Sequence, residues 1–123
     1  MIYLASLYSN SEGAVREQRF RAACVAAARL MRAGQCVYSP IAHGHCIAAH
    51  GLPTDWQFWE PHDRRFLEQC DEVVVLMLDG WRESRGVQAE IQIAGELGKP
   101  VRYLEPVGDG ATTLAHVAEE AGL

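Results

Sequence analysis

Apolar residues along the 123-residue chain gather in four short runs, which are separated by longer segments of mixed polarity. The strongest run lies at 71–78 and is continuous from residue 73, with three adjacent valines. Such a run is typical of a strand buried on both faces in a parallel sheet. Shorter runs at 2–5, 35–38 and 101–104 predict three more strands.

The segments between these runs carry apolar residues at helical spacing. This periodicity predicts helices over 14–33, 55–69 and 84–97, and a short one over 112–120. In the second of these, Pro61 argues that the firm part begins there. The first helix is expected to bury one stripe made of Phe20, Cys24, Ala27, Ala28 and Met31. Residues 40–53 show no clear pattern and are predicted to be irregular.

Strands that alternate with helices predict a small doubly wound α/β domain, Rossmann- or flavodoxin-like, with a parallel sheet of four to five strands. Residues 1–123 are expected to form this one domain. In open α/β sheets, ligands bind beyond the carboxyl ends of the strands, where helix N-termini point. The junction between the strand at 71–78 and the helix at 84–97 is therefore the predicted binding site.

Composition excludes several classes of partner from this prediction. The net charge is -5 and Lys and Arg form no cluster, so binding to a nucleic acid polymer is not favoured. No apolar run approaches the roughly 20 residues that cross a bilayer, and no signal peptide is predicted. Four scattered cysteines without a Cys-x-x-Cys pair favour reduced thiols in a cytoplasmic protein.

Glu90 lies between the apolar and polar faces of the predicted helix at 84–97. Side chains on a helix lean toward its N-terminus, so this carboxylate would cover the turn at Gly86, where no Cβ blocks it. A surface glutamate at the edge of the apolar stripe explains the position equally well. Ser84 is a good N-cap, and the same position can offer a hydroxyl to an anion.

Asp63 and Tyr3 each have an ordinary structural explanation. Asp63 lies eight residues before Asp71 among polar neighbours, so a solvated helix face is the default interpretation. Tyr3 falls in the first strand, where an aromatic residue usually belongs to the core. If that strand is central, the Tyr3 hydroxyl could reach a neighbouring carboxylate.

Taken together, these residues resemble the nucleoside 2-deoxyribosyltransferase superfamily. That family has a tyrosine in its N-terminal strand, an aspartate eight residues before the aspartate that opens the next core strand, and a nucleophilic glutamate after a helix start. The matching residues here are Tyr3 in Ile2-Tyr3-Leu4-Ala5-Ser6, then Asp63 and Asp71, and Glu90 in Ser84-Arg-Gly-Val-Gln-Ala-Glu90. The resemblance covers most of residues 1–104.

The resemblance implies a role for each of these residues. Glu90 would be the nucleophile that attacks the anomeric carbon of a (deoxy)ribosyl group, and Tyr3 would position it. Asp63 would hydrogen-bond to the departing base or protonate it. Family members that act on free nucleosides carry an acid where this chain has Ser84, whereas the nucleoside 5′-monophosphate N-glycosidase branch has serine. The predicted substrate-binding residues are Ser84, Gly86, Ser6, Ser9, Arg85 and His45.

Three segments depart from that branch, and these departures fit an uncharacterised bacterial subfamily. The glycine- and arginine-rich turn expected after the first strand is replaced by residues 6–13, and residues 39–53 and 81–83 are also distinctive. The segment at 43–50 holds His43, His45, Cys46 and His50 and suggests zinc, but the spacing matches no standard zinc signature. We expect this segment to border the pocket, and Trp56 and Trp59 to stack on a base, pack in the core or contact another subunit.

The predicted function is cleavage or transfer at the N-glycosidic bond of a small-molecule nucleoside or nucleotide, without cofactor or metal. A non-catalytic nucleotide-sensing module of the same fold is the first alternative. A metal-dependent hydrolase, based only on the histidines, is the second. We also expect a homodimer or a larger homo-oligomer, without membrane attachment.

Overall fold

The computed structural model describes residues 1–107. Its elements, in chain order, are β1 (Ile2–Ala5), α1 (Gly13–Arg32), β2 (Val37–Tyr38), α2 (Pro40–Ala48), α3 (Trp56–Gln69), β3 (Glu72–Leu76), the short 3₁₀ helix η1 (Trp81–Glu83), α4 (Arg85–Glu96) and β4 (Val101–Leu104). The helix predicted over 112–120 lies outside the described residues. No helix within residues 1–107 is both long and apolar enough to cross a membrane.

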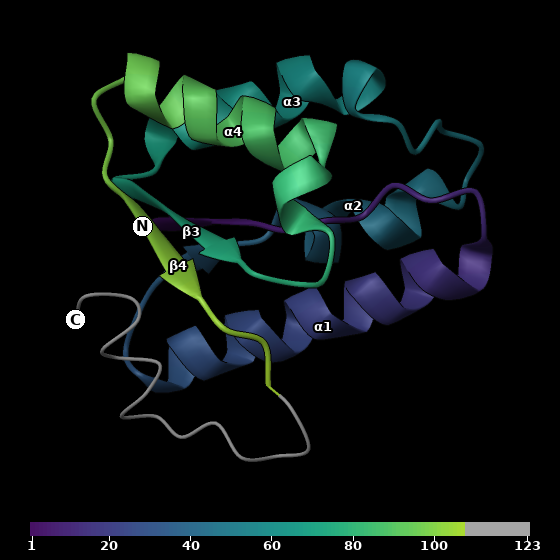
Figure 1. Cartoon of the computed structure of the whole chain (residues 1–123), viewed down its shortest axis with the longest axis horizontal. Helices are drawn as coiled ribbons and strands as arrows, with labels where there is room; N and C mark the ends of the chain where they lie inside the picture. The colour runs from purple at the N-terminus through teal and green to yellow at the C-terminus, as the bar shows by residue number, and fades with distance from the viewer. Residues whose placement is uncertain (108–123) are drawn as a thin grey trace.

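The four strands form a parallel sheet in the order β2-β1-β3-β4. Helices α3 and α4 cover one face of this sheet, and α1 lies along the other (Figure 1). The predicted doubly wound α/β fold is therefore confirmed. The chain turns from β1 to β2 on one side and from β3 to β4 on the other, so the topological switch point falls between β1 and β3.

Side chains of β1 and β3 alternate between two apolar clusters, one on each face of the sheet. The cluster against α1 contains Ile2, Leu4, Ala26, Ala27, Leu30, Val74, Leu76 and Leu104. The cluster against α3 and α4 contains Tyr3, Ala5, Leu67, Cys70, Val73, Val75, Val87, Ile93 and Ala94. Strand alternation thus places Tyr3 on the face that α3 and α4 cover.

Helix α2 corrects the sequence analysis, because residues 40–48 are helical rather than irregular. The hydroxyl of Ser39 accepts a hydrogen bond from the Ala42 backbone N–H at 3.0 Å. Pro40 then occupies the first turn, where its missing N–H would have had no partner within the helix. The start signal was present in the sequence, but the histidines and alanines after it show no clear amphipathic period.

Two helices differ in detail from their prediction. Helix α3 begins at Trp56 and runs continuously through Pro61, so Pro61 does not mark its start. Helix α1 buries Ala23, Ala26, Ala27 and Leu30, while Met31 is 53% exposed, so the predicted stripe ending in Met31 is wrong. An alanine-rich helix offers several apolar stripes, and the sheet selects the one whose small side chains allow close packing.

Candidate active site

A cavity of about 460 Å³ opens at the carboxyl ends of β1 and β3. Ser6 follows β1 directly, while Gly80 and Ser84 lie between β3 and α4, so the cavity stands at the switch point of the sheet. Its volume is in the range of ordinary small-molecule sites. The sequence analysis expected a ligand at this junction, and the structure has a cavity there.

The structure brings eight of the nine predicted site residues to the wall of this cavity. These are Glu90, Asp63, Ser84, Gly86, Ser6, Ser9, Arg85 and His45. The ninth, Tyr3, is buried beside the cavity and contacts Glu90. Residues from β1, α2, α3 and α4 and from the connecting loops thus converge on one space, although their chemical roles stay predictions.

Glu90 is buried, with 4% of its surface exposed, so its interpretation as a surface glutamate is wrong. The Tyr3 hydroxyl donates a hydrogen bond to Glu90 Oε2. Burial is the main cause that raises the pKa of the Glu90 carboxyl to about 8. The hydrogen bond from Tyr3 lowers this pKa, and the charge of the nearby Asp63 raises it. Burial and the charge of Glu90 hold the pKa of Tyr3 well above its ordinary value, so Tyr3 keeps its proton and remains a donor.

Asp63 is also buried, with 6% of its surface exposed, and this contradicts the solvated helix face expected for it. Its Oδ1 atom has no hydrogen-bond partner within residues 1–107. Burial raises the pKa of the Asp63 carboxyl to about 7. Asp63, Leu67 and Cys70 follow one another at helical spacing and are all buried, so the sequence did hold a signal for this position.

Ser84 caps α4, as the sequence analysis expected, and its Oγ accepts a hydrogen bond from the Val87 backbone N–H at 3.2 Å. The first N–H groups of a helix have no partner within the helix and carry a partial positive charge. The neighbouring Gly86 faces the ring of Trp56, and a Cβ placed there would lie 3.5 Å from that ring. The N-terminus of α4 therefore meets the cavity beside a flat aromatic surface.

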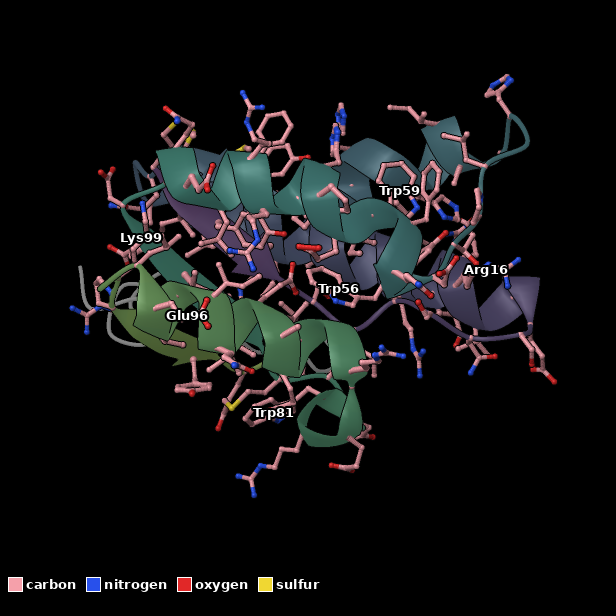
Figure 2. All side chains as sticks on the ribbon, turned by 90° about the horizontal axis from the view of Figure 1, so that it is seen from above. Arg16, Trp56, Trp59, Trp81, Glu96 and Lys99 are labelled. Carbon is pink, nitrogen blue, oxygen red and sulfur yellow. The ribbon has the colours of Figure 1, made fainter. Side chains whose placement is uncertain are left out.

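Trp56 and Trp59 both line the cavity. Figure 2 shows Trp56 in the space between α3 and α4, with Trp59 on the side toward Arg16. Trp56 packs against the cluster on the α3 and α4 face, whereas Trp59 donates from Nε1 to the Pro53 carbonyl at 2.8 Å and covers Gly44. Trp56 therefore both packs against the core and lines the cavity.

The histidines of α2 contact different neighbours. The ring of His43 stacks on that of His62, with centroids 5.7 Å apart, while His45 contacts Tyr8 and Glu17. Within residues 1–107, no group of three or more His, Cys, Asp or Glu side chains could hold a metal ion. The metal-dependent hydrolase interpretation therefore has no ligand set in the described part of the chain.

The sequence analysis missed Tyr8 and Arg19, which also line the cavity. Arg19 Nη1 donates to the backbone carbonyls of Tyr8 at 3.3 Å and Ser9 at 2.8 Å. These bonds tie the loop after β1 to the start of α1. No periodicity could mark Arg19, because its partners are carbonyls of a loop whose course depends on the rest of the fold.

Comparison with known proteins identifies the family to which the chain belongs. The model of the family described as Domain of unknown function (DUF1937) matches residues 1–105. The chain belongs to this family. The comparison with curated proteins finds no match for this DUF1937 member.

A solved structure with a similar fold is the 2-deoxyribosyltransferase from the psychrotolerant bacterium Bacillus psychrosaccharolyticus. It is 23% identical to this DUF1937 chain, with a TM-score of 0.62, and the match covers 97% of this chain and 80% of that one. This likeness shows that the DUF1937 domain shares the fold of that enzyme. Tyr3, Asp63 and Glu90 all lie within the residues that match the family model.

Proposed function

We propose that this DUF1937 protein cleaves the N-glycosidic bond of a nucleoside 5′-monophosphate or nucleoside, or transfers its (deoxy)ribosyl group. The observation that carries the proposal is the buried Tyr3–Glu90 pair, which shares one cavity with the buried carboxyl of Asp63. A carboxylate held by a hydrogen bond can attack a sugar carbon, and a carboxyl with a pKa near 7 can deliver a proton.

In the proposed reaction, a Glu90 carboxylate oxygen forms a bond to C1′ of the sugar as the bond from C1′ to the base nitrogen breaks. The departing base takes the bonding electron pair, and Asp63 supplies the proton that neutralises it. Water or a second base then attacks C1′ as the bond from C1′ to Glu90 breaks, and the ionised Asp63 takes the proton that the attacking group gives up. The product is the free sugar or a new nucleoside, or the 5′-phosphate of either where the substrate is a monophosphate. Two carboxyl groups with separate roles are the usual requirement for glycosidic chemistry.

A nucleotide-sensing module is the second candidate, since it would use the same cavity. It would not need Asp63 and Glu90, however. Burying two carboxyl groups raises the pKa of both and opposes their ionisation, which costs stability near neutral pH. Groups with perturbed pKa values that share a cleft are more typical of catalysis.

The proposal is tested by incubating the purified protein with ribo- and deoxynucleosides and their 5′-monophosphates. Free base is measured by chromatography, with Glu90→Ala as the parallel variant. We expect base release from the monophosphates that is lost in the variant. Release only in the presence of a second base would assign a transferase. Tight binding without release would support the sensor instead, and neither binding nor release would contradict both candidates.

Ser84→Asp is expected to shift the preference from 5′-monophosphates toward nucleosides. We propose that the 5′-phosphate binds at the N-terminus of α4, where Ser84 lines the cavity. An aspartate at this position adds a negative charge there, so monophosphate affinity should fall about tenfold or more. Aspartate is as good an N-cap as serine, so α4 should keep its start. The measurement is the ratio of kcat/KM for a 5′-monophosphate and its nucleoside.

Glu83→Gln is the matched control for this charge change, because Glu83 lines the same cavity one residue before Ser84. Removing its negative charge should move the ratio weakly toward the monophosphate. An unchanged ratio in Ser84→Asp would contradict a phosphate contact at this helix start, while leaving glycosidic cleavage intact.

A further inference from the structure

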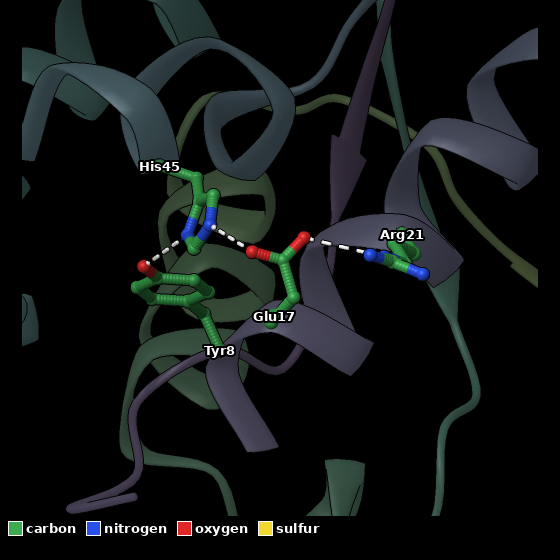
Figure 3. A network of polar contacts seen from close by, with 4 residues as sticks. All are labelled: Tyr8, Glu17, Arg21 and His45. Carbon is green, nitrogen blue, oxygen red and sulfur yellow. Dashed lines mark hydrogen bonds and ion pairs between the residues drawn. The ribbon is translucent and has the colours of Figure 1, made fainter. Parts of the chain in front are cut away.

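Polar contacts connect four side chains, two of which line the cavity (Figure 3). Tyr8, in the loop after β1, lies with its Oη 2.6 Å from Nδ1 of His45 on α2. The Nε2 atom of His45 lies 3.1 Å from Oε1 of Glu17 on α1. The other Glu17 oxygen, Oε2, accepts from Arg21 Nε at 3.2 Å. Tyr8 and His45 line the cavity, and Glu17 and Arg21 support them from α1.

The charge of Glu17 determines the direction of each hydrogen bond in this network. Hydrogen bonds from His45 and Arg21 lower the pKa of the Glu17 carboxyl, which is therefore ionised and can only accept. His45 must then carry a hydrogen on Nε2, and in the neutral ring this leaves Nδ1 as an acceptor. The Tyr8 hydroxyl consequently donates its hydrogen to Nδ1.

Tyr8 keeps that hydrogen under ordinary conditions. Burial raises the pKa of the Tyr8 phenol, although the charge of the Arg16 guanidinium and its hydrogen bond to the phenol oxygen oppose the shift. Arg16 Nη1 also donates to the Asn10 carbonyl in the same loop. With its hydrogen committed to His45, the phenol oxygen offers only lone pairs, to Arg16 and to any further partner.

Ring packing holds this arrangement in place without a ligand. The ring of Phe20 stacks on that of His45 with centroids 4.3 Å apart and an interplanar angle of 21°. The Tyr8 ring meets His45 edge-on, at 5.6 Å and 81°. The His45 side chain is only 18% exposed. A preorganised acceptor of this kind binds a ligand donor without first losing conformational freedom.

We propose that Tyr8 is a specificity-determining residue whose hydroxyl oxygen accepts a hydrogen bond from a donor group of the bound ligand. His45 and Glu17 are the positioning residues that set this polarity. The inference rests on the proposed function, in which the ligand is a nucleoside or nucleotide. The donor is then an exocyclic amino group of the base or a hydroxyl of the sugar. A carbonyl oxygen at the same place would face a lone pair and lose affinity.

The test compares ligand affinities in a Glu90→Gln background, which prevents turnover. Isothermal titration calorimetry measures the affinity for each member of two ligand pairs. In the first pair, adenosine 5′-monophosphate carries an amino group where inosine 5′-monophosphate carries a carbonyl group. A second pair differs in the sugar 2′-hydroxyl. We expect a preference of about three- to tenfold for the donor in one pair, and Tyr8→Phe should abolish it. The pair that responds shows whether base or sugar supplies the donor.

Tyr103→Phe is the matched control, because it removes the hydroxyl of a partly exposed tyrosine on β4. It should leave both preferences unchanged. The inference fails if Tyr8→Phe retains the preference of its parent, even where cleavage itself has been demonstrated. If no ligand of either pair binds, the assignment of such a donor to Tyr8 fails, while the proposed function is judged separately by base release from the wild type.

Glu17→Gln separates this role from a merely structural one. The glutamine amide can donate to Nε2, which would move the imidazole hydrogen to Nδ1 and turn the Tyr8 hydroxyl into a donor toward the cavity. The preference should then weaken or reverse, whereas a general loss of packing would lower both affinities equally. Arg21→Gln keeps the Glu17 carboxylate and should keep the preference.

The hydrogen-bond polarity can also be measured without any ligand. Nitrogen-15 NMR of the His45 ring distinguishes the two neutral tautomers, and we expect the hydrogen on Nε2 in the wild type. Glu17→Gln should populate the other tautomer. A hydrogen on Nδ1 of neutral wild-type His45 would overturn the proposed direction of the network.

Discussion

Replacing Glu90 with glutamine is expected to reduce the rate of base release by roughly 10³- to 10⁶-fold for any substrate that the wild type cleaves. The amide cannot form the bond to C1′, so no glycosyl intermediate can accumulate. Its size and its carbonyl oxygen suit the site, because that oxygen can still accept the hydrogen bond from Tyr3. Single-turnover base release measures the loss, and intact-mass spectrometry of the quenched wild type should detect a glycosyl adduct that the variant lacks.

The same variant should remain folded and should melt higher than the wild type in mild alkali. Burial raises the Glu90 pKa from 4.5 to about 8, so the folded state binds this proton more tightly than the unfolded state does. The group therefore lowers stability as pH rises from about 4.5 to about 8. A neutral glutamine lacks this dependence. The difference in Tm between variant and wild type should thus be larger near pH 8 than near pH 5.

Glu96→Gln provides the control on the same helix, because Glu96 is exposed at the end of α4. It should change neither base release nor the pH dependence of Tm. If Glu90→Gln released base at the wild-type rate, the proposed nucleophile would be wrong, whatever the stability data showed.

Replacing Asp63 with asparagine is expected to reduce kcat/KM for base release by roughly 10²- to 10⁴-fold and to change the pH profile. Glu90 must be ionised to attack, so the rate should rise as its carboxyl loses the proton with a pKa of about 8. Asp63 must be protonated to act as an acid, so the rate should fall as it ionises, with a pKa of about 7. The two carboxyls interact, and their combined profile should peak between about pH 7 and pH 8.

Asp63→Asn should lose the falling alkaline limb, so its residual activity should rise to a plateau above about pH 8. A substrate whose base already carries a positive charge, such as a 7-methylguanine nucleotide, needs no proton to depart and should restore much of the rate. Glu68→Gln, an exposed change on the same helix, is the control. If the alkaline limb persisted in Asp63→Asn, a group other than Asp63 would be responsible for it.

Much of the fold follows from the sequence alone. The valines of β3 predict a strand buried on both faces, and alternation of strands with helices predicts a parallel sheet. These patterns are local, because each depends on side chains a few residues apart. Strand alternation also decides that Tyr3 and Ala5 share a face, so Tyr3 could be expected to meet a helix on that side.

The candidate residues for the proposed chemistry, Tyr3, Asp63 and Glu90, came from the resemblance of their motifs to a known family, because no local pattern alone assigned them a role. The sequence did not determine whether Asp63 and Glu90 are buried or exposed to solvent. A carboxylate at the edge of a helix stripe is compatible with solvent and with burial. The choice depends on how the neighbouring elements pack around it, and in this protein Asp63 and Glu90 are both buried. Their raised pKa values are consequences of that packing.

Only the tertiary structure decided the network of Tyr8, His45 and Glu17. These residues come from a loop, from α2 and from α1, and no local pattern records which face of one element meets another. Contacts between residues far apart in sequence form only when the sheet brings their elements together. The sequence by itself therefore determined the strands, most of the helices and the candidate chemical groups, while the packing of helices around the switch point decided which groups are buried, paired and open to the cavity.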